Sequence, residues 1–177
     1  MKNIVTLFSG RGSNMQAIVA ADIPNANIAA VLSNRPDAAG LIWAAERGIT
    51  TASLDHKAYG SRLEFDHAMM TLIDKYEPDL VVLAGFMRIL TPDFCRHYEG
   101  KLINIHPSLL PAFTGLNTHE RALEAGCRLA GCSIHFVTPD LDCGPIITQG
   151  LVPILDNDNA DDIAARVLSV EHQLLPR

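Results

Sequence analysis

The sequence predicts an α/β fold, with a mainly parallel, twisted sheet that carries helices on both faces. Short apolar runs alternate along the whole chain with segments of helical spacing. The run at residues 80–84 is apolar throughout, as expected of a strand buried on both faces of a parallel sheet. Alternation of this kind favours right-handed crossovers between parallel strands.

The N-terminal part begins with this alternation. Residues 4–8 form a short apolar run, interrupted by one threonine, and helical spacing starts at Met15. A second strand is expected at residues 28–32 and a second helix at residues 38–47. Gly48 follows that helix, where a left-handed residue commonly ends a helix.

The middle of the chain has clear helix-start signals. Ser61 followed by Glu64 predicts a capping box, and apolar residues then recur at helical spacing up to Tyr76. The apolar strand at residues 80–84 comes next. Thr91 and the proline after it supply an N-cap and a first-turn proline, so a short helix is expected there, ending near residue 100.

The C-terminal part continues the pattern. A strand at residues 102–106 is ended by a proline, and a helix is expected at residues 118–125. Two further strands are expected at residues 132–137 and 146–152. Asn159 is the expected cap of a last helix, with two aspartates in its first turn, where the helix dipole favours negative charge.

Composition excludes several classes of function. The chain has 177 residues, which fits a single domain, and its net charge of −6 argues against nucleic acid as a partner. The four cysteines and seven histidines have no metal-binding spacing, so no metal is expected. No signal peptide and no membrane span of roughly 20 apolar residues is found. The expected location is therefore cytoplasmic, without a membrane partner.

In sheets of this type, ligands bind beyond the carboxyl ends of the strands, where the topology changes direction. The loop at residues 9–14 contains two glycines before a helix start, so its backbone N–H groups could converge on a phosphate. The alternative is a turn that merely requires glycine. The loop at residues 85–90 holds one arginine among apolar side chains, which could line a flat apolar pocket or simply pack in the core.

Asn104 and His106 are the strongest candidates for catalysis. They are two residues apart on a predicted strand and so point to the same side of the sheet. An amide N–H beside an imidazole can hold a developing oxyanion. A carboxylate from residues 138–145 could then orient the histidine, and spacing alone leaves Asp140 and Asp142 as alternatives. Together these residue types indicate transfer of an acyl-type group without a covalent intermediate, since no nucleophile elbow is present.

Three motifs together resemble the folate-dependent formyltransferase family. They are residues 82–90 (Val-Leu-Ala-Gly-Phe-Met-Arg-Ile-Leu), 104–111 (Asn-Ile-His-Pro-Ser-Leu-Leu-Pro) and 141–145 (Leu-Asp-Cys-Gly-Pro). The glycine loop at residues 9–14 and residues 115–119 (Gly-Leu-Asn-Thr-His) are similar to the glycinamide ribonucleotide branch of the family. Because the resemblance covers essentially the whole chain in order, it implies a Rossmann-like formyltransferase fold.

The resemblance also implies an activity and its partners. The formyl group of 10-formyltetrahydrofolate, the co-substrate, would pass directly to the amine of glycinamide ribonucleotide in de novo purine synthesis. Asn104 and His106 would stabilise the oxyanion. Asp142 would orient and charge His106 and support proton shuttling through water, which selects Asp142 over Asp140 by resemblance.

Binding residues are carried over in the same way. The resemblance implies a nucleotide-phosphate half at about residues 1–100 and a folate and catalytic half at about residues 101–177. The expected nucleotide-binding residues are Gly12, Ser13, Asn14, Arg62 and Glu171. The expected folate-binding residues are Met87, Arg88, Ile89, Leu90, Asn104, Thr138, Asp140, Leu141 and Asp142.

The chain departs from the family pattern in three places. Residues 112–114 (Ala-Phe-Thr) and Cys143 differ from it, and the chain stops at Arg177, so we expect the family's C-terminal tail to be missing. Two alternative functions stay open. One is formyltetrahydrofolate deformylase, which transfers the formyl group to water, and the other is a non-catalytic folate or nucleotide binder. The oligomeric state is also open, with a homodimer among the alternatives.

Overall fold

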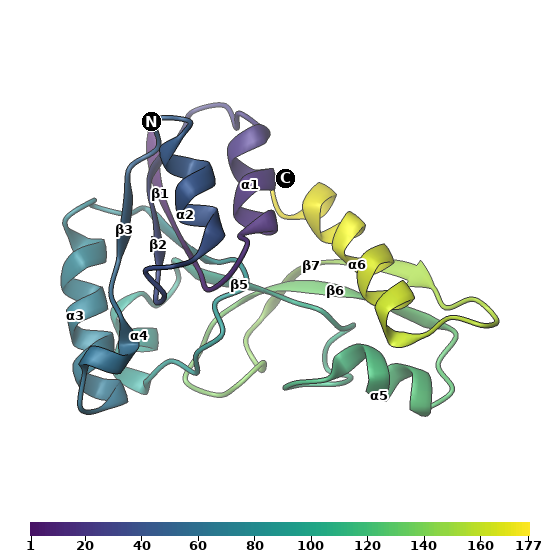
Figure 1. Cartoon of the computed structure of the whole chain (residues 1–177). Helices are drawn as coiled ribbons and strands as arrows, with labels where there is room; N and C mark the ends of the chain where they lie inside the picture. The colour runs from purple at the N-terminus through teal and green to yellow at the C-terminus, as the bar shows by residue number, and fades with distance from the viewer.

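A seven-stranded sheet forms the centre of the computed structural model, which describes residues 1–177 (Figure 1). The strands are β1 (Lys2–Phe8), β2 (Ala26–Ser33), β3 (Thr51–Ser53), β4 (Leu80–Leu83), β5 (Leu102–His106), β6 (Leu129–Phe136) and β7 (Ile146–Pro153). Their order across the sheet is β3-β2-β1-β4-β5-β6-β7. The strands from β3 to β5 pair in parallel, and β6 pairs antiparallel with both β5 and β7. The predicted mainly parallel sheet is confirmed.

Helices cover both faces of this sheet, as predicted. They are α1 (Ser13–Ala20), α2 (Ala39–Ala45), α3 (Arg62–Asp74), α4 (Pro92–His97), α5 (Thr118–Glu124) and α6 (Ala160–Leu174), with a short 3-10 helix, η1 (His56–Ala58). Helices α3 and α4 lie on one face, and α1, α2 and α6 on the other (Figure 1). None of these helices is long and apolar enough to cross a membrane.

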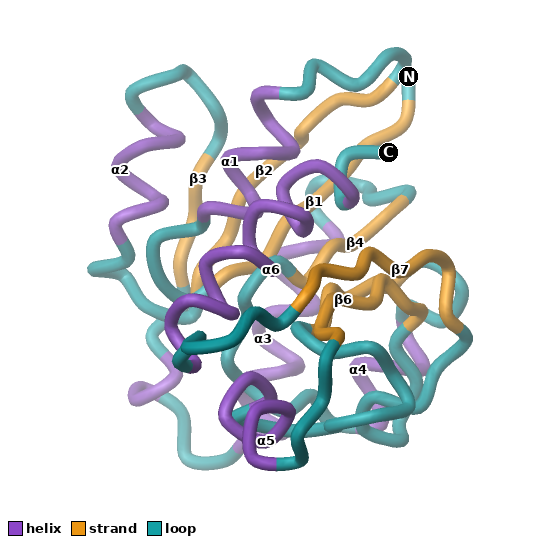
Figure 2. The backbone as a smooth tube through the Cα atoms, turned by 90° about the vertical axis from the view of Figure 1, so that its right-hand side faces the viewer, coloured by secondary structure: helices purple, strands orange, loops and turns teal.

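Helix α6 links the antiparallel end of the sheet to helix α1. It packs on β6 and β7 and also contacts α1, so the C-terminus lies beside the N-terminal part of the fold (Figure 2). The two predicted halves of the chain therefore share one continuous sheet, and their division near residue 100 stays a prediction. The contact between α1 and α6 brings the C-terminal helix to the helix that follows β1.

The alternation of side chains along β1 explains its continuous apolar run. Ile4 and Phe8 pack in the core beneath α1, α2 and α6, whereas Val5 and Leu7 pack in the core beneath α3 and α4. Successive side chains of a strand point to opposite faces, so both faces of this central strand are buried. The sheet thus has two apolar cores, one on each side.

The capping signals are mostly confirmed, with one correction. Ser61 caps α3 by accepting from the Glu64 N–H, but the Glu64 carboxylate accepts from the N–H of Gly60 and not from that of Ser61. The predicted capping box is therefore only half formed. The box at Asn159 is complete, because Asp162 accepts from the Asn159 N–H and Asn159 accepts in return.

Strand β3 was not predicted. Its three residues, Thr51–Ser53, are half-buried at the edge of the sheet and carry no apolar run. They form a strand because they pair with the free edge of β2, so the contact with a distant segment, and not their own sequence, determines the strand. Elsewhere the expected elements are present, and their ends shift by a few residues. Helix α1, for example, begins at Ser13 and not at Met15.

Candidate functional site

A cavity of about 770 Å³ lies beyond the carboxyl ends of the central parallel strands. The strand order changes direction between β1 and β4, and this is where open α/β sheets bind ligands. The loops after these two strands are joined, because the N–H of Met87 donates to Oγ of Ser9 at 2.8 Å. The cavity therefore belongs to the fold's switch point and includes the 85–90 loop in its wall.

Most of the residues predicted from the sequence line this cavity. They are Asn14, Arg62, Met87, Arg88, Ile89, Leu90, Asn104, His106, Thr138, Asp140, Leu141, Asp142 and Glu171. Gly12 and Ser13 do not line it and lie beside Asn14 at the start of α1. Chain segments separated by more than a hundred residues are thus brought to one place.

The start of α1 has a conformation suited to an anion. Gly12 is in the left-handed region, with φ 71°, and supplies no side-chain cap to the helix. A Cβ atom at Gly12 would lie 2.9 Å from Cε of Met15 and 3.1 Å from the ring of Phe8. Asn14 is buried, and its Oδ1 has no hydrogen-bond partner. The uncapped helix start leaves backbone N–H groups available to a bound phosphate, whereas the unpaired amide oxygen of Asn14 can accept from a donor group of a ligand.

Asn104 is held by a histidine on the neighbouring strand. It lies directly opposite His135 in the antiparallel pair of β5 and β6. The Nδ1–H of His135 donates to the Phe136 carbonyl at 3.0 Å, so its Nε2 accepts from the Asn104 amide nitrogen at 3.3 Å. Burial lowers the pKa of His135, which keeps this ring neutral. The second N–H of Asn104 remains free for a ligand.

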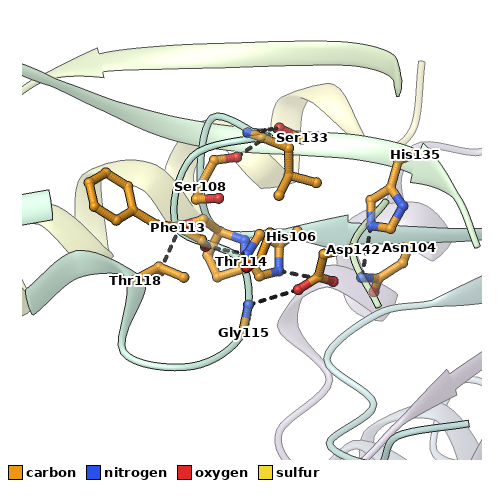
Figure 3. A network of polar contacts seen from close by, with 12 residues as sticks. Asn104, His106, Ser108, Phe113, Thr114, Gly115, Thr118, Ser133, His135 and Asp142 are labelled. Atoms are coloured by element: carbon orange, nitrogen blue, oxygen red, sulfur yellow. Dashed lines mark hydrogen bonds and ion pairs between the residues drawn. The ribbon is translucent and has the colours of Figure 1, made fainter. Parts of the chain in front are cut away.

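His106 is held from the other side by backbone (Figure 3). Its Nε2 lies 2.9 Å from the Phe113 carbonyl, and a carbonyl only accepts, so Nε2 carries the proton. Nδ1 is then the nitrogen that faces Asp142, with 3.6 Å between it and Oδ1. That distance is an ion-pair contact and is too long for a hydrogen bond.

Asp142 and Asp140 have different environments. The Asp142 side chain is only 8% exposed, and its Oδ2 accepts from the Gly115 N–H at 2.8 Å. Asp140 is exposed at the cavity rim. Of the two carboxylates that spacing left open, only Asp142 contacts His106.

Glu171 brings a second carboxyl group to the cavity. It comes from α6, is 6% exposed, and lines the cavity together with Asn14 and Arg62. Burial raises the pKa of Glu171 to about 7. A carboxyl group with this pKa can be neutral or ionised near physiological pH, so it can donate to or accept from a polar ligand.

Another part of the cavity wall, around its mouth, is apolar. Met87, Ile89 and Leu141 are each more than half exposed around the mouth, which is unusual for large apolar side chains. The Arg88 guanidinium lies 4.7 Å from the centre of the Phe65 ring, and its Nε has no hydrogen-bond partner. These residues suit a flat apolar ligand with a polar edge.

Sequence reasoning missed the groups that hold the predicted residues in place. His135, the Phe113 carbonyl and the Gly115 N–H were not proposed as parts of the site. Spacing along a single strand could not indicate His135, because this residue lies on β6 and contacts Asn104 across the pair of strands. The other two groups belong to the backbone and have no sequence signature. No cluster of three or more His, Cys, Asp or Glu side chains could hold a metal ion.

Comparison with known proteins gives a consistent result. A family model described as formyl transferase matches residues 2–177. The chain is 52% identical over 177 residues to phosphoribosylglycinamide formyltransferase of Escherichia coli (strain K12), which covers 98% of this chain and 84% of that protein. It is 45% identical over 176 residues to the trifunctional purine biosynthetic protein adenosine-3 of Homo sapiens, which covers 98% of this chain and 17% of that protein.

Solved structures are similar as well. Phosphoribosylglycinamide formyltransferase from Coxiella burnetii, in complex with CHES, matches with a TM-score of 0.92 and 47% identity, over 99% of this chain and 83% of that chain. Glycinamide ribonucleotide transformylase 1 from Symbiobacterium toebii matches with a TM-score of 0.95 and 43% identity, over 99% of this chain and 84% of that chain. The Rossmann-like α/β fold expected from the sequence is the fold of these structures.

Proposed function

The chain belongs to the formyl transferase family, and we propose that it transfers the formyl group of 10-formyltetrahydrofolate to the amine of glycinamide ribonucleotide in de novo purine synthesis. The observation that carries this proposal is the convergence of Asn104, His106 and Asp142 at the edge of one cavity. Relatives that the chain matches over most of their length are named for this activity. The cavity is large enough for two ligands to meet in it.

The reaction begins when the substrate amine attacks the formyl carbon. The formyl oxygen becomes negative, and the free N–H of Asn104 and the Nδ1–H of protonated His106 donate to it. Asp142 stabilises the positive imidazole. Removal of one such donor typically costs about 10²- to 10³-fold in rate, so much of the catalysis must come from positioning the two substrates.

A proton must then move from the attacking amine to the leaving nitrogen of the folate. In this proposal Asp142 orders a water that carries the proton, and its contacts with His106 and with the Gly115 N–H, which fix its position, support this role. The carbon–nitrogen bond to the folate breaks as the intermediate collapses. No residue is acylated, which agrees with the lack of a nucleophile elbow.

The two substrates occupy different parts of the cavity in this proposal. The nucleotide phosphate binds at Gly12, Ser13 and Asn14, with Arg62 as the cation. Glu171 faces the ribose and amine. The folate lies along the wall formed by Met87, Arg88, Ile89, Leu90, Thr138, Asp140 and Leu141.

The proposal has further parts that remain predictions. We expect a cytoplasmic enzyme that uses no metal and binds neither nucleic acid nor membrane. Its net charge of −6 supports the absence of a nucleic-acid partner. The oligomeric state is to be measured, with a homodimer as one alternative.

A direct assay tests the proposed function. Loss of 10-formyltetrahydrofolate is followed with glycinamide ribonucleotide added and omitted, and the formylated nucleotide is identified by mass. Loss that requires the nucleotide and yields this product supports the transferase. Equal loss without the nucleotide would instead indicate a deformylase, and saturable binding without loss would indicate a non-catalytic binder.

A further inference from the structure

One short loop contacts both members of the His106–Asp142 pair. We call residues 113–116 the 113–116 loop. Its Phe113 carbonyl accepts from Nε2 of His106 at 2.9 Å, and its Gly115 N–H donates to Oδ2 of Asp142 at 2.8 Å. Figure 3 shows both contacts on the same side of the pair. The position of this loop therefore decides which His106 nitrogen faces the cavity.

The loop has a backbone conformation that needs support. Phe113 and Gly115 have φ values of 54° and 78°, and Asn117, directly after the loop, has φ 55°. The left-handed region is disfavoured for phenylalanine, and such a residue persists only where surrounding contacts hold it. A different contact holds the segment before the loop: Oγ of Ser108 donates to the Ala112 carbonyl at 2.6 Å.

Arg121, on α5, supplies this support. Its Nη1 donates to the carbonyls of Thr114 and Leu116, the latter at 3.0 Å. Its Cζ also lies 5.5 Å from the centre of the Phe113 ring. A charged, planar guanidinium makes stronger and more directional hydrogen bonds to carbonyls than a neutral donor does. One half-buried side chain thus contacts three of the four residues of the loop.

We propose that Arg121 is a positioning residue for the formyl transfer. It holds the 113–116 loop so that the Phe113 carbonyl keeps His106 in the Nε2–H form and turns Nδ1 toward Asp142 and the reacting oxygen. The inference rests on the proposed function, but the effect on the His106 ring does not depend on it. Arg121 does not line the cavity, so it acts only through the loop.

The chain offers a matched control in Arg47. Its Nη1 donates to the Trp43 carbonyl at 3.0 Å, and its Cζ lies 3.9 Å from the Trp43 ring centre. It therefore makes the same two kinds of contact as Arg121, at the end of α2 and outside the cavity. Comparison with an Arg47 variant therefore shows whether an effect comes from the loss of the Arg121 contacts or from the loss of any arginine that contacts a carbonyl and a ring.

The test compares Arg121→Ala, Arg121→Lys and Arg47→Ala. Steady-state kinetics give kcat and both KM values, and ¹⁵N chemical shifts of the His106 ring give its tautomer. For Arg121→Ala we expect kcat to fall by roughly tenfold to a hundredfold, because small misplacement of reacting groups has effects of that size. The KM for the nucleotide should stay unchanged, and the His106 shifts should lose the Nε2–H pattern.

The other variants make the outcome decisive. Arg121→Lys keeps a charged donor and should restore part of both signals, whereas Arg47→Ala should leave both as in the wild type. Wild-type kcat and unaltered His106 shifts in Arg121→Ala would overturn the proposal, as would equal losses in Arg121→Ala and Arg47→Ala. If the wild-type protein transfers no formyl group, the proposed function fails, and the ring shifts still test the role of Arg121.

Discussion

The amide nitrogen of Asn104 donates to Nε2 of His135, 3.3 Å away, on the adjacent antiparallel strand. Because the other nitrogen of His135 donates to a backbone carbonyl, this contact fixes which end of the amide is nitrogen. Asn104 therefore presents an N–H, and not its oxygen, to the cavity. That orientation is the one an oxyanion requires.

Asn104→Asp tests this orientation. The change keeps the shape of the side chain but replaces its donors with a carboxylate, which faces the lone pair of His135 and repels an oxyanion. We expect kcat to fall by about 10²- to 10³-fold, the usual cost of losing one oxyanion donor. Steady-state kinetics at saturating substrates measure it, with the circular dichroism spectrum as a check on folding. A kcat within threefold of wild type would remove Asn104 from the mechanism.

The second prediction concerns His106. Its Nε2 is occupied by the Phe113 carbonyl, so only Nδ1 can act on a substrate. His106→Ala should lower kcat by about 10²- to 10⁴-fold, the typical contribution of one acid–base group. The dissociation constants of both substrates, measured by calorimetry, should change little, because in the proposed arrangement their main contacts lie elsewhere in the cavity. Unchanged turnover, or an equal loss of binding and turnover, would contradict this role.

The sequence predicted the sheet, and the position of Asn104 and His106 on one of its strands, for a definable reason. Apolar runs such as that of β4 and the i, i+2 spacing of Asn104 and His106 are local patterns, so they can be recognised without coordinates. The choice between Asp140 and Asp142 was different, because both occupy the same turn and only the path of the loop decides which one reaches His106. Spacing could not provide that path.

Tertiary effects account for the remaining misses. Thr51–Ser53 becomes β3 because β2 has a free edge, and no local pattern indicates it. Glu64 turns to the Gly60 N–H, which breaks the expected capping box. The partners of His106 and Asp142 at Phe113 and Gly115 are backbone atoms, which every residue has, so their use in the site cannot be read from residue types.

The third prediction concerns Gly144, in the loop that carries Asp142. A Cβ atom at this buried glycine would overlap the carbonyl oxygen of Phe136. Gly144→Ala must therefore move the loop, and we expect a loss of about 1–3 kcal/mol in the free energy of unfolding, together with a lower kcat. Urea unfolding and steady-state kinetics measure the two effects.

Gly60→Ala is the matched control for Gly144→Ala. The nearest atom to a Cβ atom at Gly60 is a carboxylate oxygen of Glu64, at 3.2 Å, which belongs to a flexible, exposed side chain. That variant should unfold and turn over like the wild type. If Gly144→Ala matched it in both measurements, tight packing of the Asp142 loop would not matter for the site.

The last prediction is a pH dependence of stability caused by Glu171. Burial raises the pKa of its carboxyl group from 4.5 to about 7 in the folded protein. Because the folded value is the higher one, the stabilising contribution of Glu171 is complete below pH 4.5 and is lost as the pH rises through about 7. At pH 8 the fold contains a buried negative charge that a glutamine would not carry.

Glu171→Gln should therefore be more stable, relative to the wild type, at pH 8 than at pH 5, by on the order of 1–3 kcal/mol. Chemical unfolding of both proteins at several pH values measures the difference, and Glu124→Gln, at an exposed position of α5, is the control. A difference that stays constant from pH 5 to pH 8 would show that Glu171 is not buried as an acid. Because glutamine replaces one acceptor oxygen of the carboxylate with an NH₂ donor, and the nucleotide binds beside Glu171 in our proposal, the same variant should raise the KM for the nucleotide and leave that of the folate unchanged. Gained stability together with weakened nucleotide binding is what distinguishes a carboxyl group retained for substrate recognition from one retained for folding.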